Sequence, residues 1–260
     1  MSDKVLLILV DGMRPDSIPA CGNPDFEAFY RSGTHCLNSA TTYPPVTLPC
    51  HMSMFHSVDP ERHGVYSNDF VKQNHPIDGL VEVLAKAGKT TAFFYMWEGL
   101  RDLCTPRNHL SYSWYMSWHY YKEKQLDWRA TRAAEEHIRE LAPDFVFLYL
   151  GETDEIGHKY GWMSPEYLNA VKTASECIDH ICHMLPEAYS VIVTADHGGH
   201  GRNHGDDIPE DMTIPIVFHS AKLAPGAVDG INIKDIAPTI AAIIGVQPGA
   251  EWEGVSLLKR

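Results

Sequence analysis

The run Val5-Leu6-Leu7-Ile8-Leu9-Val10, followed at once by Asp11-Gly12, decides the fold class of this chain. The apolar residues of the run do not alternate with polar ones, a pattern typical of a strand buried on both faces of a parallel sheet. The Asp-Gly pair is a turn signal that stops the run. We therefore predict a central strand over residues 5–10, with the Asp11 carboxylate at its carboxyl end.

Three later segments repeat this arrangement of an apolar strand that ends in polar residues. They are Thr91 to Tyr95, Phe145 to Leu150 before Gly151-Glu152-Thr153-Asp154, and Val191 to Thr194 before Ala195-Asp196-His197. Helical patterns separate the strands, over Pro24 to Ser32, Ile77 to Ala87, Trp128 to Leu141, and Pro165 to Leu185 with Ser164 as its cap. This alternation predicts an α/β fold, with a mostly parallel central sheet and helices on both faces. In such sheets, ligands bind at the carboxyl ends of the strands.

The length of the chain and its net charge limit the number of domains and the kinds of partner that we expect. The 260 residues are enough for one large α/β domain, so we expect a single domain over residues 1–260. The formal net charge of -13 argues against binding nucleic acid polymers or anionic membranes, which attract clustered Lys and Arg. An anionic substrate would need local attraction, and the 15 histidines and many aspartates can hold cations that supply it.

Neither the N-terminus nor the cysteines indicate export. The apolar run that ends at Asp11 is too short, and too soon acidic, for a signal peptide or a membrane span. Cysteines at positions 21, 36, 50, 104, 177 and 182 form no CxxC pair, which favours reduced thiols. We expect a cytoplasmic protein.

Two segments interrupt the alternation of strands and helices. Residues 104–127 show no period of 2 or 3.6, and we interpret the region of about 97–127 as a small inserted cap or rim. Its aromatic residues fit either the core or an oligomer interface, or a wall for the leaving group of a substrate. Residues 198–211, rich in Gly, His and Asp, fit a long active-site loop. The aromatic residues are Tyr112, Trp114, Tyr115, Trp118, Tyr120 and Tyr121.

Candidate metal ligands gather where the predicted strands end. Asp154 and His158 are one helical turn apart, so both could point at one ion, although the spacing alone also fits a surface salt bridge. The other pieces, taken singly, are ordinary cap and turn sequences. Their conjunction at strand ends predicts a metal site, and mixed His and Asp ligands favour zinc, with manganese second, over calcium. The candidates are Asp11, Asp154, His158, Asp196, His197 and His204.

A set of short motifs spans nearly the whole chain in one order. They are Val10-Asp11-Gly12-Met13-Arg14, Pro24-Asp25-Phe26, Thr47-Leu48-Pro49-Cys50-His51, Pro60 to Asn68, Thr153 to His158, Thr194 to His200, Asn203-His204-Gly205 and Lys234 to Ile240. Each motif alone is weak evidence. Together they resemble the alkaline phosphatase superfamily and, within it, the type I phosphodiesterase / nucleotide pyrophosphatase family.

The resemblance implies an alkaline-phosphatase-like fold that hydrolyses small phosphorylated substrates with two divalent cations. Thr47, by itself an ordinary helix cap, would attack phosphorus to give a phospho- or nucleotidyl-threonine. A threonine hydroxyl is a poor nucleophile near neutral pH, and coordination to a dication stabilises its alkoxide. Asn68 matches the family position that helps to hold a phosphoryl oxygen. One ion would be held by Asp154, His158 and His204, and the other by Asp11, Asp196, His197 and the Thr47 oxygen.

Two departures from the family pattern bear on the substrate. Leu48 follows the nucleophile, where the family often has a Phe that stacks on a nucleobase. Met54-Phe55-His56-Ser57 replaces a common Thr-Gly pair at the rear of the same helix. The nature of the leaving group therefore stays open.

Several other activities fit the same motifs. A phosphonate hydrolase or a phosphomonoesterase would use the same ligand set, and both alternatives stay open. A sulfatase is disfavoured, because Thr47 cannot be oxidised to formylglycine and His51 stands where Arg is expected. A non-catalytic metal or phosphate-binding protein is the alternative from another class, although the ligand set is complete. The oligomeric state is not indicated.

Overall fold

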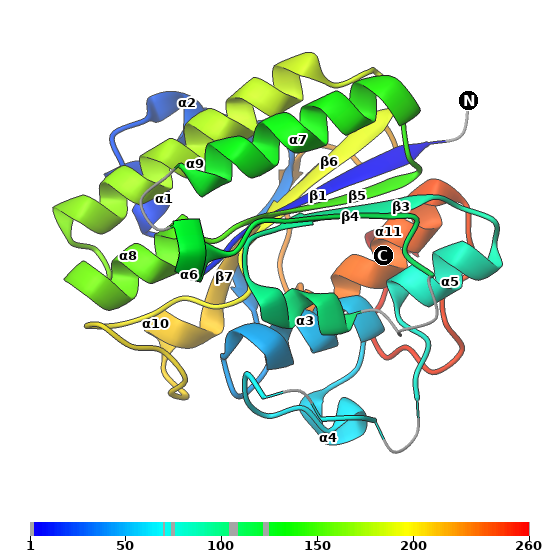
Figure 1. Cartoon of the computed structure of the whole chain (residues 1–260), viewed down its shortest axis with the longest axis horizontal. Helices are drawn as coiled ribbons and strands as arrows, with labels where there is room; N and C mark the ends of the chain where they lie inside the picture. The colour runs from blue at the N-terminus through cyan, green and yellow to red at the C-terminus, as the bar shows by residue number, and fades with distance from the viewer. Residues whose placement is uncertain (1–2, 70, 74–75, 104–108, 122–124, 260) are drawn as a thin grey trace.

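The computed structural model describes residues 3–69, 71–73, 76–103, 109–121 and 125–259, and is built on one sheet (Figure 1). Across these residues eight strands follow the order β4-β3-β5-β1-β6-β7-β2-β8. The central position of β1, between β5 and β6, agrees with its continuous apolar run. The strands are β1 (Lys4–Val10), β2 (Thr34–Ala40), β3 (Thr91–Tyr95), β4 (Tyr112–Tyr115), β5 (Phe145–Leu150), β6 (Tyr189–Thr194), β7 (Thr213–His219) and β8 (Gly226–Ala227).

The sheet is mostly parallel, as predicted. β1 pairs in parallel with β5 from Val5↔Phe145 to Val10↔Leu150, and with β6 up to Leu9↔Thr194. β7 is the exception, because it runs antiparallel to both of its neighbours, β6 and β2. This register brings the carboxyl ends of β5, β1 and β6 to the same edge of the sheet.

Helices cover both faces of the sheet, which confirms the predicted layers. In Figure 1, α1, α2, α7 and α9 lie on one side of the strands, and α3, α5 and α11 lie on the other. No described helix is both long enough and apolar enough to span a membrane. The helices are α1 (Ser17–Ala20), α2 (Pro24–Ser32), α3 (Thr47–His56), α4 (Pro60–His63), α5 (Leu80–Lys86), α6 (Trp118–Tyr121), α7 (Leu126–Leu141), α8 (Glu152–Tyr160), α9 (Pro165–Met184), α10 (Pro209–Met212) and α11 (Ile236–Ile244).

Local capping explains where two of the predicted helices begin. Ser164 accepts the Tyr167 amide at 3.2 Å and Pro165 takes the first position of α9, as predicted. α5 begins at Leu80, later than the predicted Ile77. The Gly79 amide donates to the Glu82 carboxylate at 3.1 Å, which caps the helix at that point.

The aromatic segment contributes a strand that we did not expect in a cap or rim. Tyr112–Tyr115 form β4, which pairs in parallel with β3 and extends the sheet by one strand. The ring of Tyr112 stacks on His137 of α7, with 4.0 Å between centroids. The side chains of this edge strand are mostly exposed, so the sequence has no continuous apolar run there from which a strand could be predicted. The rest of the expected insert includes residues 104–108, with Cys104, and residues 122–124, which lie outside the described residues.

Candidate metal centre and active site

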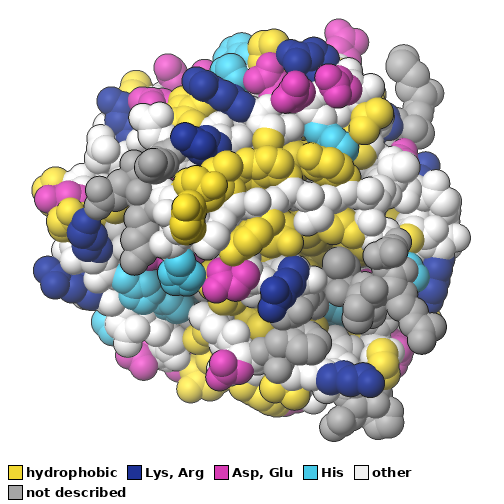
Figure 2. Space-filling view, viewed as in Figure 1, with side chains coloured by type: hydrophobic (Ala, Val, Ile, Leu, Met, Phe, Trp, Pro, Cys, Tyr) yellow, Lys and Arg dark blue, Asp and Glu magenta, His cyan; other side chains and the backbone are white. Residues whose placement is uncertain are grey.

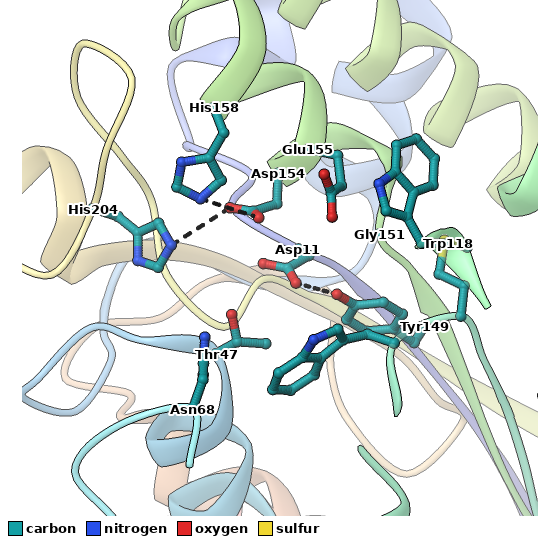
Figure 3. Close-up of a pocket in the computed structure, with 12 residues that line it drawn as sticks. Asp11, Thr47, Asn68, Trp118, Tyr149, Gly151, Asp154, Glu155, His158 and His204 are labelled. Atoms are coloured by element: carbon teal, nitrogen blue, oxygen red, sulfur yellow. Dashed lines mark hydrogen bonds and ion pairs between the residues drawn. The ribbon is translucent and has the colours of Figure 1, made fainter. Parts of the chain in front are cut away.

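The predicted ligands lie at the edge of the sheet where β5, β1 and β6 end, and Figure 3 labels Asp11, Asp154, His158 and His204 among them. Asp11 follows β1, and Asp196 and His197 follow β6. α8, which follows β5, carries two more ligands, and the loop after β6 carries the last. The structure brings all six together as two groups, Asp11 with Asp196 and His197, and Asp154 with His158 and His204.

The first group, called here the Asp11 group, comprises Asp11, Asp196 and His197, which are all buried. His197 Nε2 lies 3.3 Å from Asp11 Oδ1 and 3.5 Å from Asp196 Oδ2. The hydroxyl oxygen of Thr47 lies 3.3 Å from the same nitrogen. These four atoms can bind one cation together.

Hydrogen bonds determine which atom each residue of the Asp11 group presents. His197 Nδ1 contacts the Gly198 carbonyl at 2.8 Å, so Nε2 faces the group. Asp196 Oδ1 accepts two main-chain amides, at 3.0 and 3.2 Å, which leaves Oδ2 for a ligand. Asp11 Oδ2 accepts the hydroxyl of Tyr149, which leaves Oδ1.

The second group, called here the Asp154 group, comprises Asp154, His158 and His204. His158 Nε2 lies 3.4 Å from Asp154 Oδ2, and His204 Nε2 lies 3.7 Å from Asp154 Oδ1 (Figure 3). The Nδ1 atoms of the two histidines contact the carbonyls of Arg202 and Pro45, at 3.0 and 2.8 Å. Both Nε2 atoms are therefore turned toward Asp154, as in metal sites whose histidines are held by outer hydrogen bonds.

Trp162 contacts residues of the Asp154 group and the main chain next to Asp11. Its indole nitrogen donates to the Gly12 carbonyl at 2.8 Å, next to Asp11. Its ring lies edge-on to His158, with 5.1 Å between centroids, and 5.9 Å from the ring of His204. The residue sits outside every motif quoted above, and its position one turn beyond His158 was the only available signal.

Three buried carboxylate oxygens of the two groups lack a hydrogen-bond partner within the described part of the chain. They are Asp11 Oδ1, Asp154 Oδ1 and Asp196 Oδ2, and each lies within 3.7 Å of a histidine Nε2. An unpaired buried carboxylate is costly, and a bound cation removes that cost. Carboxylate and imidazole donors together suit zinc or manganese, so the residues present fit the expected ions.

Burial and neighbouring charges set the protonation of these groups. Burial, followed by the charge of Asp196, raises the pKa of Asp11 and of Asp154 well above the usual value. Burial also lowers the pKa of His197 to about 4 and of His204 to about 3. The imidazoles are therefore neutral at neutral pH, which is the form that binds metals.

Thr47 begins α3 without serving as its cap. Val46 is the N-cap residue, its backbone is extended, and the helix start has no side-chain cap. The Thr47 hydroxyl lies beside the Asp11 group on the wall of a cavity (Figure 3). A capping role therefore does not account for this hydroxyl.

Asn68 lies next to Thr47 on the same wall (Figure 3). Its Oδ1 accepts the Leu48 amide at 3.0 Å. The amide nitrogen of the side chain, which can only donate, is left for the cavity. The main chain at the start of α3 thus orients a donor beside the nucleophile candidate.

Comparison with known proteins identifies the family of the chain. The type I phosphodiesterase / nucleotide pyrophosphatase family matches residues 5–214. The chain belongs to this family. Ectonucleotide pyrophosphatase/phosphodiesterase family member 7 of Rattus norvegicus is 25% identical over 225 residues, which cover 75% of this chain and 49% of the relative. The chain thus spans about half the length of that curated relative.

Solved structures of related proteins share the fold. Murine ectonucleotide pyrophosphatase/phosphodiesterase 5, an inactive threonine-to-alanine variant in complex with AMP, matches with a TM-score of 0.80 at 16% identity. The match covers 96% of this chain and 98% of that one. Phosphonate monoester hydrolase of Agrobacterium radiobacter matches with a TM-score of 0.74 at 14% identity, over 98% and 76% of the two chains. These likenesses show an alkaline-phosphatase-like fold.

The cavity of this phosphodiesterase-family protein measures about 190 Å³ and lies in front of the two groups. Trp97 and Tyr149 line it together with Asp11 and the Asp154 group, and neither of these two aromatic residues was among the predicted site residues. Trp97 follows β3 closely and Tyr149 lies near the end of β5, so strand-end position was the signal that could have found them. Leu48, where the family often has Phe, is fully buried and does not line the cavity.

The structure separates the aromatic segment into two parts. Trp118 lines the cavity beside Met96 and Glu155. Tyr112 and Tyr115 belong to β4, are 40% and 43% exposed, and contact other rings of the sheet edge. Figure 2, which has the same view as Figure 1, shows a band of hydrophobic side chains across the face that is turned to the viewer. Trp118 is therefore the member of the segment, among the described residues, that lies at the site.

A third cluster holds the loop that carries His204. The buried Asp211 carboxylate accepts the amides of Gly205 and Asp206, each at 2.9 Å. Its other oxygen lies 2.8 Å from His200 Nδ1. Both oxygens of Asp211 are thus already used by the loop, so this cluster ties the loop in place.

Proposed function

We propose that this protein is a two-cation hydrolase that uses Thr47 as nucleophile on phosphodiester or pyrophosphate bonds. One observation carries the proposal: unpaired buried carboxylate oxygens and inward-facing imidazoles surround a helix-start hydroxyl that has no capping role. The murine relative, described as inactive once a threonine is replaced by alanine, supports a threonine nucleophile. We take zinc as the first choice of metal and manganese as the second.

The ligand atoms divide between two cations. The Asp154 group would hold one ion, and the Asp11 group together with Thr47 Oγ1 would hold the other. When bound, the ions supply positive charge that stabilises the Thr47 alkoxide and offsets the charge of the phosphoryl oxygens.

The residues of the chain then perform a double displacement. Thr47 gives its hydroxyl proton to solvent, and Oγ1 attacks phosphorus in line with the leaving oxygen, so that the new O–P bond forms as the old one breaks. The leaving group departs with its bonding electrons and takes a proton from solvent. Asn68 donates from its amide nitrogen to a phosphoryl oxygen. Water then attacks the phospho- or nucleotidyl-threonine and restores the hydroxyl.

Trp97 and Trp118 are our candidates for the leaving-group wall. They face the cavity while Leu48 is buried, so they replace the aromatic contact that the family often has next to the nucleophile. Trp118 also lines a second cavity, of about 530 Å³, whose other lining residues include members of α8 and α9. Stacking of a leaving group on one indole contributes roughly 1 to 3 kcal/mol.

A substrate panel on protein of measured metal content tests the proposal. We expect faster turnover of bis(p-nitrophenyl) phosphate than of p-nitrophenyl phosphate, and no sulfatase activity on p-nitrophenyl sulfate. Phosphate release from phosphonoacetate would instead assign a phosphonate hydrolase, and a preference for the monoester would assign a phosphatase. Protein that holds two metals but turns over none of these compounds would refute the hydrolase proposal and favour a binding protein.

A further inference from the structure

Tyr149 is hydrogen-bonded to Asp11, one of the candidate metal ligands. Its hydroxyl donates to Asp11 Oδ2, which Figure 3 marks with a dashed line. Tyr149 is buried in β5, the strand that pairs with β1, so its position relative to Asp11 is set by the sheet register. The opposite oxygen, Asp11 Oδ1, is the unpaired one that lies 3.3 Å from His197 Nε2.

Asp11 differs in this respect from the other ligands of its group. Asp196 is oriented by two main-chain amides and His197 by a main-chain carbonyl, contacts that no side-chain substitution can remove. Asp11 instead accepts a hydrogen bond from a side chain, the hydroxyl of Tyr149. Removal of the Tyr149 hydroxyl oxygen would therefore change how Asp11 is oriented, without a change to the ligands themselves.

The hydrogen bonds leave each member of the Asp11 group with a single atom for a cation. These atoms are Asp11 Oδ1, Asp196 Oδ2, His197 Nε2 and Thr47 Oγ1. Four single-atom ligands match the tetrahedral preference of zinc. Calcium takes six to eight oxygens, often with two from one carboxylate, and magnesium and manganese favour six oxygen ligands.

We propose that Tyr149 sets the metal selectivity of the Asp11 group by limiting the Asp11 carboxylate to one coordinating oxygen. The inference rests on the proposed two-cation function. Without the hydroxyl, Asp11 Oδ2 becomes available, the carboxylate can bind through both oxygens, and a larger coordination number becomes accessible. Tyr149 is thus a positioning residue that acts on the metal through Asp11.

The test compares Tyr149→Phe with Tyr189→Phe in the full chain. The first substitution removes only the hydroxyl, in a strand that already contains Phe145 and Phe147. Tyr189 is a matched control, because its buried hydroxyl donates to the Pro143 carbonyl at 2.6 Å, at the opposite end of the sheet from the site. Metal-free proteins are reconstituted with zinc alone, with zinc and manganese in competition, and with cobalt for visible absorption.

We expect Tyr149→Phe to bind zinc about 10- to 100-fold more weakly at one of its two sites, the usual effect of losing an outer partner of a metal ligand. Its zinc-over-manganese preference should fall, and its d–d absorption per cobalt should weaken, because tetrahedral cobalt absorbs more strongly than cobalt of higher coordination number. Tyr189→Phe should match the wild type in all three measurements. Equal changes in both variants, or none in Tyr149→Phe, would overturn the inference.

Wild-type protein separates this inference from the proposed function. Fewer than two bound metals in active wild-type protein would refute the two-cation function itself. If Tyr149→Phe fails to fold, X-ray absorption of His158→Ala loaded with one zinc per chain still decides, because this substitution removes a ligand of the Asp154 group and leaves the Asp11 group intact. Four light-atom neighbours of that zinc support the inference, and five or six overturn it.

Discussion

The imidazole rings of His197 and His204 stack with 3.8 Å between centroids and 16° between planes, although each belongs to a different ligand group. Their outer nitrogens contact separate carbonyls, of Gly198 and Pro45, so neither ring is free to turn away. Two positive rings could not share this arrangement without repulsion. The stack therefore disfavours simultaneous protonation of both rings, and it joins the two groups through their histidines.

Metal uptake should release protons from carboxyl groups and not from these histidines. Burial raises the pKa of Asp11, Asp154 and Asp196. These carboxyl groups therefore hold protons more strongly than usual in the metal-free protein, and a cation must displace those protons when it binds. The pKa of His197 is about 4 and that of His204 about 3, so both are deprotonated at neutral pH. Affinity should thus rise with pH, and fewer protons should leave at higher pH. Calorimetry of zinc binding at pH 6, 7 and 8, in buffers of different ionisation enthalpy, measures this, and heats independent of buffer would contradict it.

Thr47→Ala should keep both metals and lose at least about a thousandfold in kcat, since it removes the nucleophile and only one coordinating oxygen. Thr47→Ser is the matched control, because it keeps the hydroxyl and should retain measurable turnover. Intact-mass analysis of quenched reactions should show a covalent adduct with the wild type and none with Thr47→Ala. Turnover of Thr47→Ala at the wild-type rate would disprove the nucleophile assignment.

Asn68 has two separable roles, and two variants distinguish them. Asn68→Asp keeps an oxygen that can accept the Leu48 amide and removes the donor to the phosphoryl group. We expect a loss of roughly 100- to 1000-fold in kcat, the usual effect of removing one transition-state donor. Asn68→Ala removes both roles and should also lower the melting temperature. If Asn68→Asp retained wild-type kcat, the residue would be an anchor for α3 and nothing more.

Trp97→Ala and Trp118→Ala should each raise KM for an aryl phosphodiester by about 5- to 100-fold, in line with the loss of a stacking contact. Tyr112→Ala is the control from the same aromatic segment. Its ring stacks on His137 at the sheet edge, so it should lower thermal stability and leave KM unchanged. Unchanged KM in both tryptophan variants would mean that the leaving group binds elsewhere.

Asp211→Asn should weaken one of the two metal sites by about 10- to 100-fold, as substitutions of outer partners commonly do. The carboxylate accepts the Gly205 amide, next to His204, so its loss frees the loop that carries this ligand. Asp206→Asn is a suitable control, because that side chain is exposed and lies 3.4 Å from Nε2 of His200, on the other side of the ring from Asp211. Metal titrations measure the affinity of each site in the two variants. Equal metal affinities would show that other contacts hold the loop.

The parts of the fold that the sequence predicts are those with a continuous apolar run. β1, β5 and β6 are buried on both faces, so their composition alone marks them, and the ligands at their ends follow. β7 escapes prediction because Pro215 interrupts it. The structure accommodates this proline opposite an irregularity in β2, between Cys36 and Ser39, where no regular pairing is needed.

The contacts that orient the candidate site could not be predicted, because they join residues far apart in the sequence. The hydrogen bond from Tyr149 to Asp11 depends on the pairing of β5 with β1, and the contact of His204 with the Pro45 carbonyl depends on how a loop meets the start of α3. Neither partner carries a local signature of its role. Residue types at strand ends therefore predicted the ligands, while the atoms they present required the structure.

The central place of β1 in the sheet also governs how the protein can be made. β1 is flanked by β5 and β6, which leave the ribosome long after it, so its apolar run has no native partner during most of synthesis. The segment is rich in β-branched residues and has no charge between Val5 and Asp11. It is therefore prone to aggregate until β5 and β6 have been synthesised and can pair with it. Cotranslational protection by a chaperone, or fusion to a solubilising partner, should therefore raise the yield of folded protein more than any change to the active-site loop.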